Sequence, residues 1–279
     1  MKSFAGRVAA ITGASSGIGR ALAIELAARK CHLALCSNSN QKGLAETARL
    51  AAHRGVKITT ARVDVADRQK VHEWAGQVAR EHGKVNLIFN NAGVAFSGTV
   101  EGTGYADYEW VMGINYWGVV YGTKEFLPHL IAAGEGHVVN LSSIFGLFAQ
   151  PGMSAYNSSK FAVRGFTESL RQELDLAKNG VSATCVHPGG VKTNIAAAGR
   201  VSASVSDVTG SDADASRKTF ERLLLTSAGD AARAILGGVR RNARRVLIGV
   251  DARAADGLQR LLPGMYQGLV AAGLKLIKR

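Results

Sequence analysis

Cysteine and proline are scarce in this chain, with 3 Cys and 4 Pro among 279 residues. The three cysteines, Cys31, Cys36 and Cys185, are odd in number and form no C-x-x-C pair. We therefore expect neither a disulfide framework nor a cysteine-based zinc site, and no other metal site is predicted. So little cysteine is typical of a reducing compartment, and we expect a cytoplasmic protein.

Long apolar runs are also missing. No stretch approaches the roughly 18 uninterrupted apolar residues that a membrane-spanning helix needs. The first apolar run, residues 8–11, lies between Arg7 and Thr12 and is too short for the hydrophobic part of a signal peptide. The sequence thus predicts neither a spanning helix nor a secretion signal.

Acidic residues are few beside basic ones, and the net charge is +13. Residues 230–279 contain ten Lys/Arg and three Asp/Glu and so carry +7. Two explanations stay open, an ordinary solvated face on terminal helices or contact with an anionic membrane or polyanion. No zinc-finger or RNP motif occurs, so we do not expect a nucleic-acid partner.

Glycine is plentiful, at 33 residues, and the apolar pattern alternates between two periods. Short apolar runs predict strands at 7–12, 32–36, 57–65, 86–89, 137–141, 181–187 and 245–249. Helical spacing predicts helices at 18–29, 41–53, 69–81, 108–129 (in one or two pieces), 154–178 and 228–239. This alternation predicts an α/β fold: a single-domain, doubly wound Rossmann fold, with a parallel sheet of about seven strands and helices on both faces.

Two segments depart from the alternation. Residues 194–220 are rich in small and polar residues and follow the carboxyl end of a predicted strand, so we expect a substrate lid there. Residues 251–279 carry apolar residues three or four apart, interrupted by Pro263, and predict an amphipathic helical tail. The tail either docks on protein or lies in a membrane interface, and we favour docking.

A glycine-rich turn opens the first predicted helix, with the sequence Thr12-Gly13-Ala14-Ser15-Ser16-Gly17-Ile18-Gly19. Glycine lets the backbone approach a pyrophosphate closely, and the start of a helix offers unpaired N–H groups. The G-x-x-x-G-x-G spacing differs from both the G-x-G-x-x-G fingerprint and the P-loop. Its strand–turn–helix setting favours a dinucleotide site.

Tyr156 and Lys160 lie four residues apart on the long predicted helix and so share a face. An ammonium about 4 Å from a phenol is worth about 4 kcal/mol at an effective dielectric constant of 20. That energy corresponds to a decrease of about two to three in the pKa of the phenol. We therefore expect Lys160 to lower the pKa of Tyr156 and to make it a usable acid or base.

Together with the glycine-rich turn and Tyr156-x-x-x-Lys160, four further motifs make the sequence resemble the short-chain dehydrogenase/reductase family. They are Asn90-Asn91-Ala92-Gly93, Asn115, Ser142-Ser143 and Pro188-Gly189-x-Val191-x-Thr193. The resemblance implies an oxidoreductase that interconverts an alcohol and a carbonyl, with Tyr156 as general acid/base. It also implies that Lys160 contacts the nicotinamide ribose, that Ser143 orients the substrate oxygen and that Asn115 holds a relay water.

The resemblance further implies a cofactor site. The turn residues Gly13, Ser15, Ser16, Gly17, Ile18 and Gly19 would hold the pyrophosphate. Asp64 and Val65 would contact the adenine, and Asn91, Ala92 and Gly93 would form the adenosine-side wall. Pro188, Gly189, Val191 and Thr193 would frame the nicotinamide.

The end of the second predicted strand favours NADP(H) over NAD(H). Ser37 and Asn38 stand where members that bind NAD place a carboxylate, so nothing there repels a 2′-phosphate. An arginine common in the family is absent from this place, and NAD(H) remains possible.

The substrate is the least determined feature of the sequence. Phe145 and its apolar neighbours Val94, Phe96, Phe148 and Met153 either line the pocket or cover the core. They suggest that the small-molecule substrate is an apolar alcohol or ketone of retinoid, steroid, fatty or aromatic type, and the resemblance implies that Ser143 and Tyr156 contact it. The resemblance implies a homodimer or homotetramer. The alternative functions are a non-catalytic nucleotide-binding regulatory or scaffold protein of the same fold, and an isomerase, epimerase or dehydratase.

Overall fold

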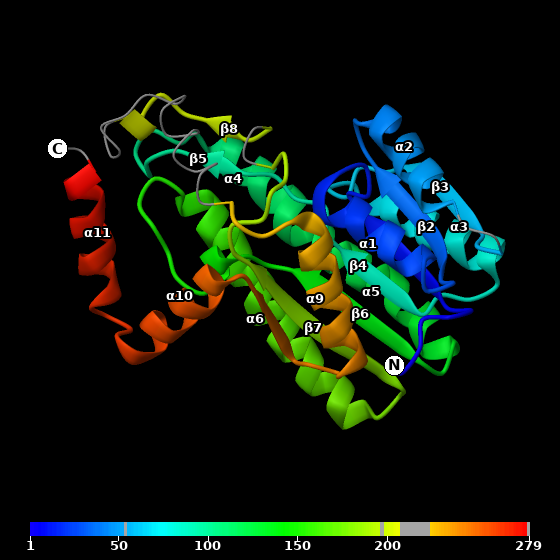
Figure 1. Cartoon of the computed structure of the whole chain (residues 1–279). Helices are drawn as coiled ribbons and strands as arrows, with labels where there is room; N and C mark the ends of the chain where they lie inside the picture. The colour runs from blue at the N-terminus through cyan, green and yellow to red at the C-terminus, as the bar shows by residue number, and fades with distance from the viewer. Residues whose placement is uncertain (53–54, 196–197, 207–223, 278–279) are drawn as a thin grey trace.

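The seven main strands form one sheet in the order β3-β2-β1-β4-β6-β7-β9, and every neighbouring pair is parallel. The computed structural model describes residues 1–52, 55–195, 198–206 and 224–277 (Figure 1). The strands are β1 Val8–Thr12, β2 His32–Ser37, β3 Ile58–Arg62, β4 Leu87–Asn90, β6 Gly136–Leu141, β7 Val181–Pro188 and β9 Arg245–Ile248. The predicted doubly wound Rossmann fold is confirmed.

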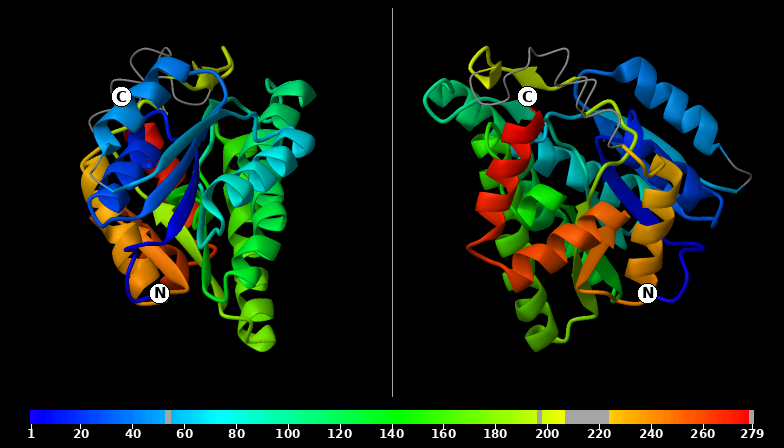
Figure 2. Two further views of the ribbon diagram at one scale, coloured as in Figure 1. Left: turned by 90° about the vertical axis from the view of Figure 1, so that its right-hand side faces the viewer. Right: turned by 60° about the vertical axis from the view of Figure 1, so that its left-hand side comes forward.

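Helices cover both faces of the sheet, as the two turned views show (Figure 2). One apolar cluster joins the sheet to α1 (Gly17–Ala27), α2 (Gln41–Ala51) and α9 (Ala228–Arg240). The other joins it to α3 (Arg68–His82), α5 (Gly118–Ala132) and α6 (Ser154–Ala177). Successive residues of a strand point to opposite faces, so Ala9 and Ile11 enter the first cluster while Val8 and Ala10 enter the second.

The predicted helix at 108–129 begins earlier and has an internal irregularity. Helix α4 spans Tyr105–Met112, a π-helical segment η1 spans Gly113–Trp117, and α5 follows directly. A π-helical segment inserts extra backbone into a helix and commonly occurs at functional sites. Here it contains Asn115.

A small second sheet lies near α4 and was not predicted. Strand β5 (Phe96–Ser97) pairs in parallel with β8 (Arg200–Val201). Arg200 also stacks on Trp110, 3.8 Å from the ring centroid, and forms an ion pair with Asp107 at 3.3 Å. These contacts anchor residues 198–206 of the predicted lid, whose residues 196–197 and 207–220 lie outside the described part of the chain.

The last part of the chain forms two helices on either side of Pro263. They are α10, Val250–Leu261, and α11, Tyr266–Ile277. We call residues 250–277 the C-terminal arm. Figure 1 shows the arm extending from the end of β9 past one edge of the sheet. A short helix, η2 (Ile144–Gly146), follows β6, and α10 packs near it.

Because all seven strands of the sheet are parallel, their carboxyl ends meet at one edge. The order reverses at β1, which lies between β2 and β4. Ligands of doubly wound sheets bind outside such a switch point. The glycine-rich turn, residues 91–93, Ser143 and Gly189 follow these strand ends, whereas Asn115, Tyr156 and Lys160 lie in helical segments.

Candidate active site

The glycine-rich turn after β1 has little room for side chains at its glycine positions. Gly13 and Gly17 have φ of +63° and +55°, a region that favours glycine. A Cβ atom at Gly19 would lie 2.4 Å from the carbonyl oxygen of Gly13. The turn is tied to the end of β4, because Asn91 Nδ2 donates hydrogen bonds to the carbonyls of Thr12 and Gly13 at 2.8 and 3.1 Å.

The start of α1 is open to an anion. Ser16 is its N-cap residue but makes no side-chain capping hydrogen bond, so the first N–H groups are not satisfied from that side. A cavity of about 320 Å³ adjoins this helix end. It is lined by Ser16, Gly17, Arg20, Ala21, Ile24, Lys192, Thr193, Asn194 and Ala228. Free N–H groups and cationic side chains around one cavity fit a pyrophosphate.

Arg20 is a part of this region that the sequence analysis missed. Its guanidinium donates hydrogen bonds to the carbonyls of Ser15 and Gly43 at 2.6 and 3.2 Å, and to Thr47 Oγ1 at 2.9 Å. The arginine thus joins the glycine-rich turn to α2. The feature of the sequence that could have indicated this role is the position of Arg20 directly after Gly19 of the turn.

The expected adenosine pocket is assembled from three strand ends. Ser37 Oγ donates a hydrogen bond to Ser15 Oγ at 3.1 Å, and Asn38 Nδ2 donates to Asp64 Oδ2 at 2.8 Å. The other carboxylate oxygen of Asp64 accepts from the Ala66 nitrogen at 3.0 Å. Asp64 therefore also stabilises the turn after β3. The neighbouring Val65 is buried, and Ile18 packs on the core beneath the turn.

Tyr156 and Lys160 project from the first turns of α6 into the interior, with exposed fractions of 8% and 4%. Lys160 Nζ donates a hydrogen bond to the Leu141 carbonyl at 3.0 Å and lies 5.7 Å from the centroid of the Tyr156 ring. A Cβ atom at Gly93 would lie 3.5 Å from Lys160 Nζ and 3.2 Å from Asn115 Oδ1. Three of the predicted motifs, those containing Gly93, Asn115 and the Tyr156–Lys160 pair, therefore meet at one place.

Asn115 is completely buried within η1. Its Oδ1 accepts a hydrogen bond from the Val94 nitrogen at 2.8 Å, while Nδ2 donates to the Val94 carbonyl at 3.0 Å and to Ser159 Oγ at 3.1 Å. The side chain thus fixes the backbone that follows Gly93. Its role in holding a relay water stays a prediction.

The expected pKa of Tyr156 needs a correction. Burial raises the pKa of its phenol, and a hydrogen bond with Ser143 opposes the increase only in part. Burial also lowers the pKa of Lys160 to about 8. The charge of Lys160 alone would lower the pKa of Tyr156, but the cost of desolvating both groups in a closed interior is larger. In this structure the phenol is protonated at neutral pH, which suits a proton donor.

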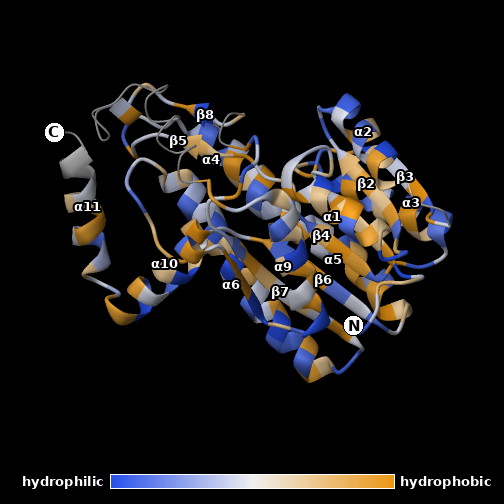
Figure 3. Ribbon diagram, viewed as in Figure 1, coloured by the Kyte–Doolittle hydropathy of each residue, from blue (hydrophilic) through white to orange (hydrophobic). Residues whose placement is uncertain are grey.

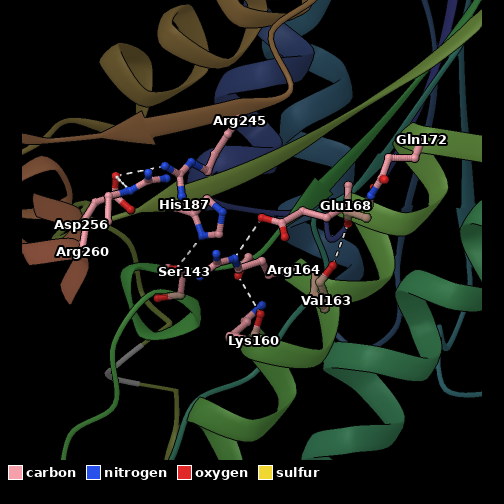
Figure 4. A network of polar contacts seen from close by, with 12 residues as sticks. Ser143, Lys160, Val163, Arg164, Glu168, Gln172, His187, Arg245, Asp256 and Arg260 are labelled. Carbon is pink, nitrogen blue, oxygen red and sulfur yellow. Dashed lines mark hydrogen bonds and ion pairs between the residues drawn. The ribbon is translucent and has the colours of Figure 1, made fainter. Parts of the chain in front are cut away.

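Ser143 is held through its backbone by His187. The Ser143 hydroxyl accepts a hydrogen bond from the Phe145 nitrogen at 3.2 Å, and its carbonyl oxygen lies 3.0 Å from His187 Nδ1 (Figure 4). Since a carbonyl only accepts, His187 carries its proton on Nδ1. Burial lowers the pKa of His187 to about 4, so the ring is neutral and donates this bond.

Two ion pairs lie near His187 on adjoining elements. Arg164 pairs with Glu168 at 2.9 Å on α6, and Arg245 pairs with Asp256 at 3.0 Å between β9 and α10 (Figure 4). Burial is the main cause of the lowered pKa of His187; both arginines lower it further, whereas Glu168 acts in the opposite direction.

The segment expected to frame the nicotinamide, residues 188–193, is held in place by contacts on two sides. Val191 forms an isolated bridge with Thr226, and a Cβ atom at Gly17 would lie 3.1 Å from Thr193 Cγ2. The Gly190 nitrogen donates a hydrogen bond to Asp251 Oδ2 at 2.5 Å, and Gly189 leaves the room that this carboxylate occupies. Asp251 was not predicted, because 61 residues separate it from Gly190 and no local pattern links them.

Aromatic rings run in contact from Tyr156 to the C-terminal arm. Phe145 contacts Tyr156 at a centroid distance of 6.2 Å and Phe148 at 5.5 Å, and Phe148 contacts Tyr266 at 6.1 Å. Tyr266 Oη accepts a hydrogen bond from the Ala149 nitrogen at 3.3 Å. By contrast, Phe96 is buried in a small core cluster with Val111 and Ala155.

The three cysteines lie among the described residues, where they are buried and free. The described residues contain no group of three or more His, Cys, Asp or Glu placed to bind a metal ion. None of the helices they form is both long and apolar enough to cross a bilayer.

The chain belongs to the short chain dehydrogenase family, whose sequence model matches residues 7–202. This membership defines an oxidoreductase of Rossmann fold and confirms the resemblance. Over 275 residues the chain is 49% identical to "Putative oxidoreductase SadH" of Mycobacterium tuberculosis, covering 98% of this chain and 97% of that one. It is also 38% identical to human "Estradiol 17-beta-dehydrogenase 11" over 193 residues, which are 69% of this chain and 64% of that protein.

Solved structures agree with this assignment. A short chain dehydrogenase/reductase from Burkholderia phymatum in complex with NAD has a TM-score of 0.85 and 30% identity, and the match covers 96% of this chain and 97% of the other. A short chain dehydrogenase from Mycobacterium paratuberculosis bound to NAD has a TM-score of 0.76 and 27% identity, with coverages of 90% and 98%. These similarities support a nicotinamide cofactor for members of this family.

Proposed function

We propose that this protein is an NADP(H)-dependent oxidoreductase that interconverts an apolar alcohol and the matching carbonyl compound. The observation that carries the proposal is the convergence of Tyr156, Lys160 and Asn115 beside Gly93, at the carboxyl edge of a sheet whose first turn fits a pyrophosphate. Family membership supplies the reaction class.

The chain's own residues perform the proton chemistry. Ser143 donates a hydrogen bond to the substrate oxygen, and Tyr156 gives its phenolic proton to that oxygen during reduction. When bound, the nicotinamide supplies the hydride. The burial-raised pKa of Tyr156 keeps the proton available at neutral pH, and oxidation of an alcohol runs the same transfer backwards.

Lys160 and Asn115 support this transfer. In the proposal the ammonium of Lys160 contacts the nicotinamide ribose and stabilises the phenolate left after proton donation. Asn115 fixes the Val94 backbone beside Lys160 and holds the water that returns a proton. Burial of both side chains keeps the geometry rigid.

The preference for NADP(H) is supported by the end of β2. Ser37 and Asn38 present a hydroxyl and an amide there, and β2 continues into Ser39 and Asn40 without a carboxylate. The Arg20 guanidinium adds positive charge where the glycine-rich turn meets α2. Both features favour a 2′-phosphate.

An apolar substrate is supported by the rings beside Tyr156. Phe145 and Phe148 follow Ser143 on the same loop, and Tyr266 of the arm closes the row. A substrate whose carbonyl reaches Tyr156 would place its remaining atoms near these faces. We therefore favour aromatic, steroid-like or long-chain ketones over sugars.

We also propose that the protein forms a homo-oligomer. Trp117 and Phe161, in neighbouring helical segments, are 46% and 39% exposed. Large exposed apolar side chains of this kind are typical of subunit interfaces. Light scattering on the purified protein gives its mass, and a monomer at all concentrations would contradict this part of the proposal.

The experiment that tests the function is a panel of ketones and alcohols with NADPH, NADH and their oxidised forms, followed by nicotinamide absorbance. We expect turnover of apolar ketones with NADPH and a lower kcat/KM with NADH. If the protein binds NADPH but turns over none of the combinations of substrate and cofactor, the assignment as an enzyme is contradicted. Preference for NADH would contradict the cofactor assignment alone.

A further inference from the structure

The end of the chain combines an uncharged stretch with charges of one sign. Residues 261–274 contain no charged residue, and residues 257–279 contain Arg260, Lys275, Lys278 and Arg279 but no acid. A surface helix usually places charged residues on its outer face. Most of the described residues of α11 are nevertheless exposed.

The inner face of the C-terminal arm is already docked on the protein. Tyr266 is 7% exposed and contacts Phe148 and the Ala149 nitrogen. In α10, Asp251 accepts a hydrogen bond from Gly190, and the buried Asp256 pairs with Arg245. These contacts fix which side of the arm faces the body. The docking that the sequence favoured thus accounts for one side of the arm only.

The outer face carries large apolar side chains. Leu261, Met265 and Leu269 are 81%, 69% and 53% exposed, within nine consecutive residues that bear no charge. Figure 3 shows the end of α10, next to the turn that leads to α11, in the colour of hydrophobic residues. Single exposed leucines are common, but a contiguous group without charges marks an interaction surface.

Charge distinguishes the two classes of partner. A second copy of the arm would bring the same cations and no acid from residues 257–279, so like charges would oppose pairing along this surface. An anionic bilayer instead attracts Lys and Arg beside its surface and accepts apolar side chains at the boundary of headgroups and acyl chains.

We propose that the C-terminal arm binds the surface of anionic phospholipid membranes. Leu261, Met265 and Leu269 would enter the interface, next to the cationic end of the chain. The contact is reversible, because only three apolar side chains enter the interface. This membrane contact does not depend on the proposed reaction. It would bring the loop with Phe148 close to apolar compounds dissolved in the bilayer.

The test is sedimentation of the full chain with vesicles of phosphatidylcholine, with or without phosphatidylglycerol. We expect the protein to pellet with phosphatidylglycerol vesicles at low salt and to be released at about 0.5 M salt, where exposed charges are screened. We expect little binding to phosphatidylcholine alone. Failure to bind phosphatidylglycerol vesicles at low salt would overturn the proposal.

Two matched double variants separate the arm from general charge effects. Met265→Glu with Leu269→Glu should lower the vesicle partition coefficient by at least about tenfold. The control is Leu176→Glu with Val100→Glu, at residues 83% and 73% exposed, which makes the same change in net charge. The control should stay within about twofold of wild type. Equal losses in both variants would overturn the proposal.

A charge variant and a mass measurement complete the test. Lys275→Gln with Lys278→Gln should weaken binding to phosphatidylglycerol vesicles and flatten its salt dependence, and unchanged binding would count against the proposal. Light scattering addresses self-association. In the opposite outcome, the wild-type protein forms an oligomer and fails to bind vesicles, while the Met265→Glu, Leu269→Glu variant is a monomer. That result would show that the surface binds a second copy. All variants are compared at equal NADPH binding, which reports a folded protein.

Discussion

His187 Nδ1 lies 3.0 Å from the carbonyl oxygen of Ser143, so a buried histidine of β7 holds the backbone of the serine expected to orient the substrate. The histidine itself is completely buried, and its Nε2 atom has no hydrogen-bond partner among the described residues. An acid–base role would require contact with the substrate. The geometry instead makes His187 a positioning residue for Ser143.

The hydrogen bond from His187 predicts a difference between two variants. His187→Leu removes the donor and should lower kcat about tenfold or more, because the Ser143 hydroxyl loses its placement. His187→Asn has an amide nitrogen that can replace Nδ1, and it should recover most of that loss. The measurement is kcat and KM for an apolar ketone, with NADPH affinity as the control for folding. Equal kcat values in the two variants would contradict the positioning role.

The Rossmann fold and its motif positions follow from short-range patterns. The continuous apolar run of β1 and the four-residue spacing of Tyr156 and Lys160 are visible in the sequence itself. The roles of Asp251 and Tyr266 depend on contacts across 61 and 117 residues, which no periodicity encodes. The π-helical segment around Asn115 has no sequence signal of comparable strength.

The pKa of Tyr156 shows a different limit of sequence analysis. The spacing from Lys160 indicates a favourable charge, but the sequence does not show how completely both groups are buried. Desolvation then determines the direction of the shift for Tyr156 and for Lys160. Geometry adds a second reason, since the Lys160 ammonium is engaged by the Leu141 carbonyl.

Cofactor preference is tested at Ser37, which is buried at the end of β2. Ser37→Asp should weaken NADP(H) binding by about tenfold or more and NAD(H) binding much less, because the new carboxylate repels the 2′-phosphate. Ser37→Asn is the neutral control of similar size. Dissociation constants by fluorescence titration check this. Parallel losses for both cofactors in the Asp variant would mean that the adenosine pocket is misplaced.

Buried histidines predict how stability depends on pH. Burial lowers the pKa of His187 to about 4 and that of His137 to about 3, below the ordinary value of 6.5. The unfolded chain therefore binds protons below about pH 6.5 that the folded chain does not. The contribution of the neutral histidines to the stability of the folded state is complete above that pH and is lost as the pH falls toward 4. The free energy of unfolding should decrease over this range.

Urea unfolding at several pH values measures the slope. One histidine contributes at most about 1.4 kcal/mol per pH unit, so His187→Asn should have a shallower slope than wild type by up to that amount. Carboxylates titrate in both the wild type and His187→Asn, so their contributions to the two slopes cancel in the comparison. Identical slopes would mean that His187 is protonated in the folded protein over this range.

The most direct test of the account is turnover by Tyr156→Phe with NADPH and an apolar ketone that the wild-type protein reduces. Phenylalanine keeps the ring that contacts Phe145 but has no proton to donate. The account predicts unchanged NADPH binding and a fall in kcat of about 10²–10⁴-fold. A variant that retained more than about a tenth of the wild-type rate would contradict the assignment of Tyr156 as the general acid, since one acid–base group contributes at least about 10²-fold.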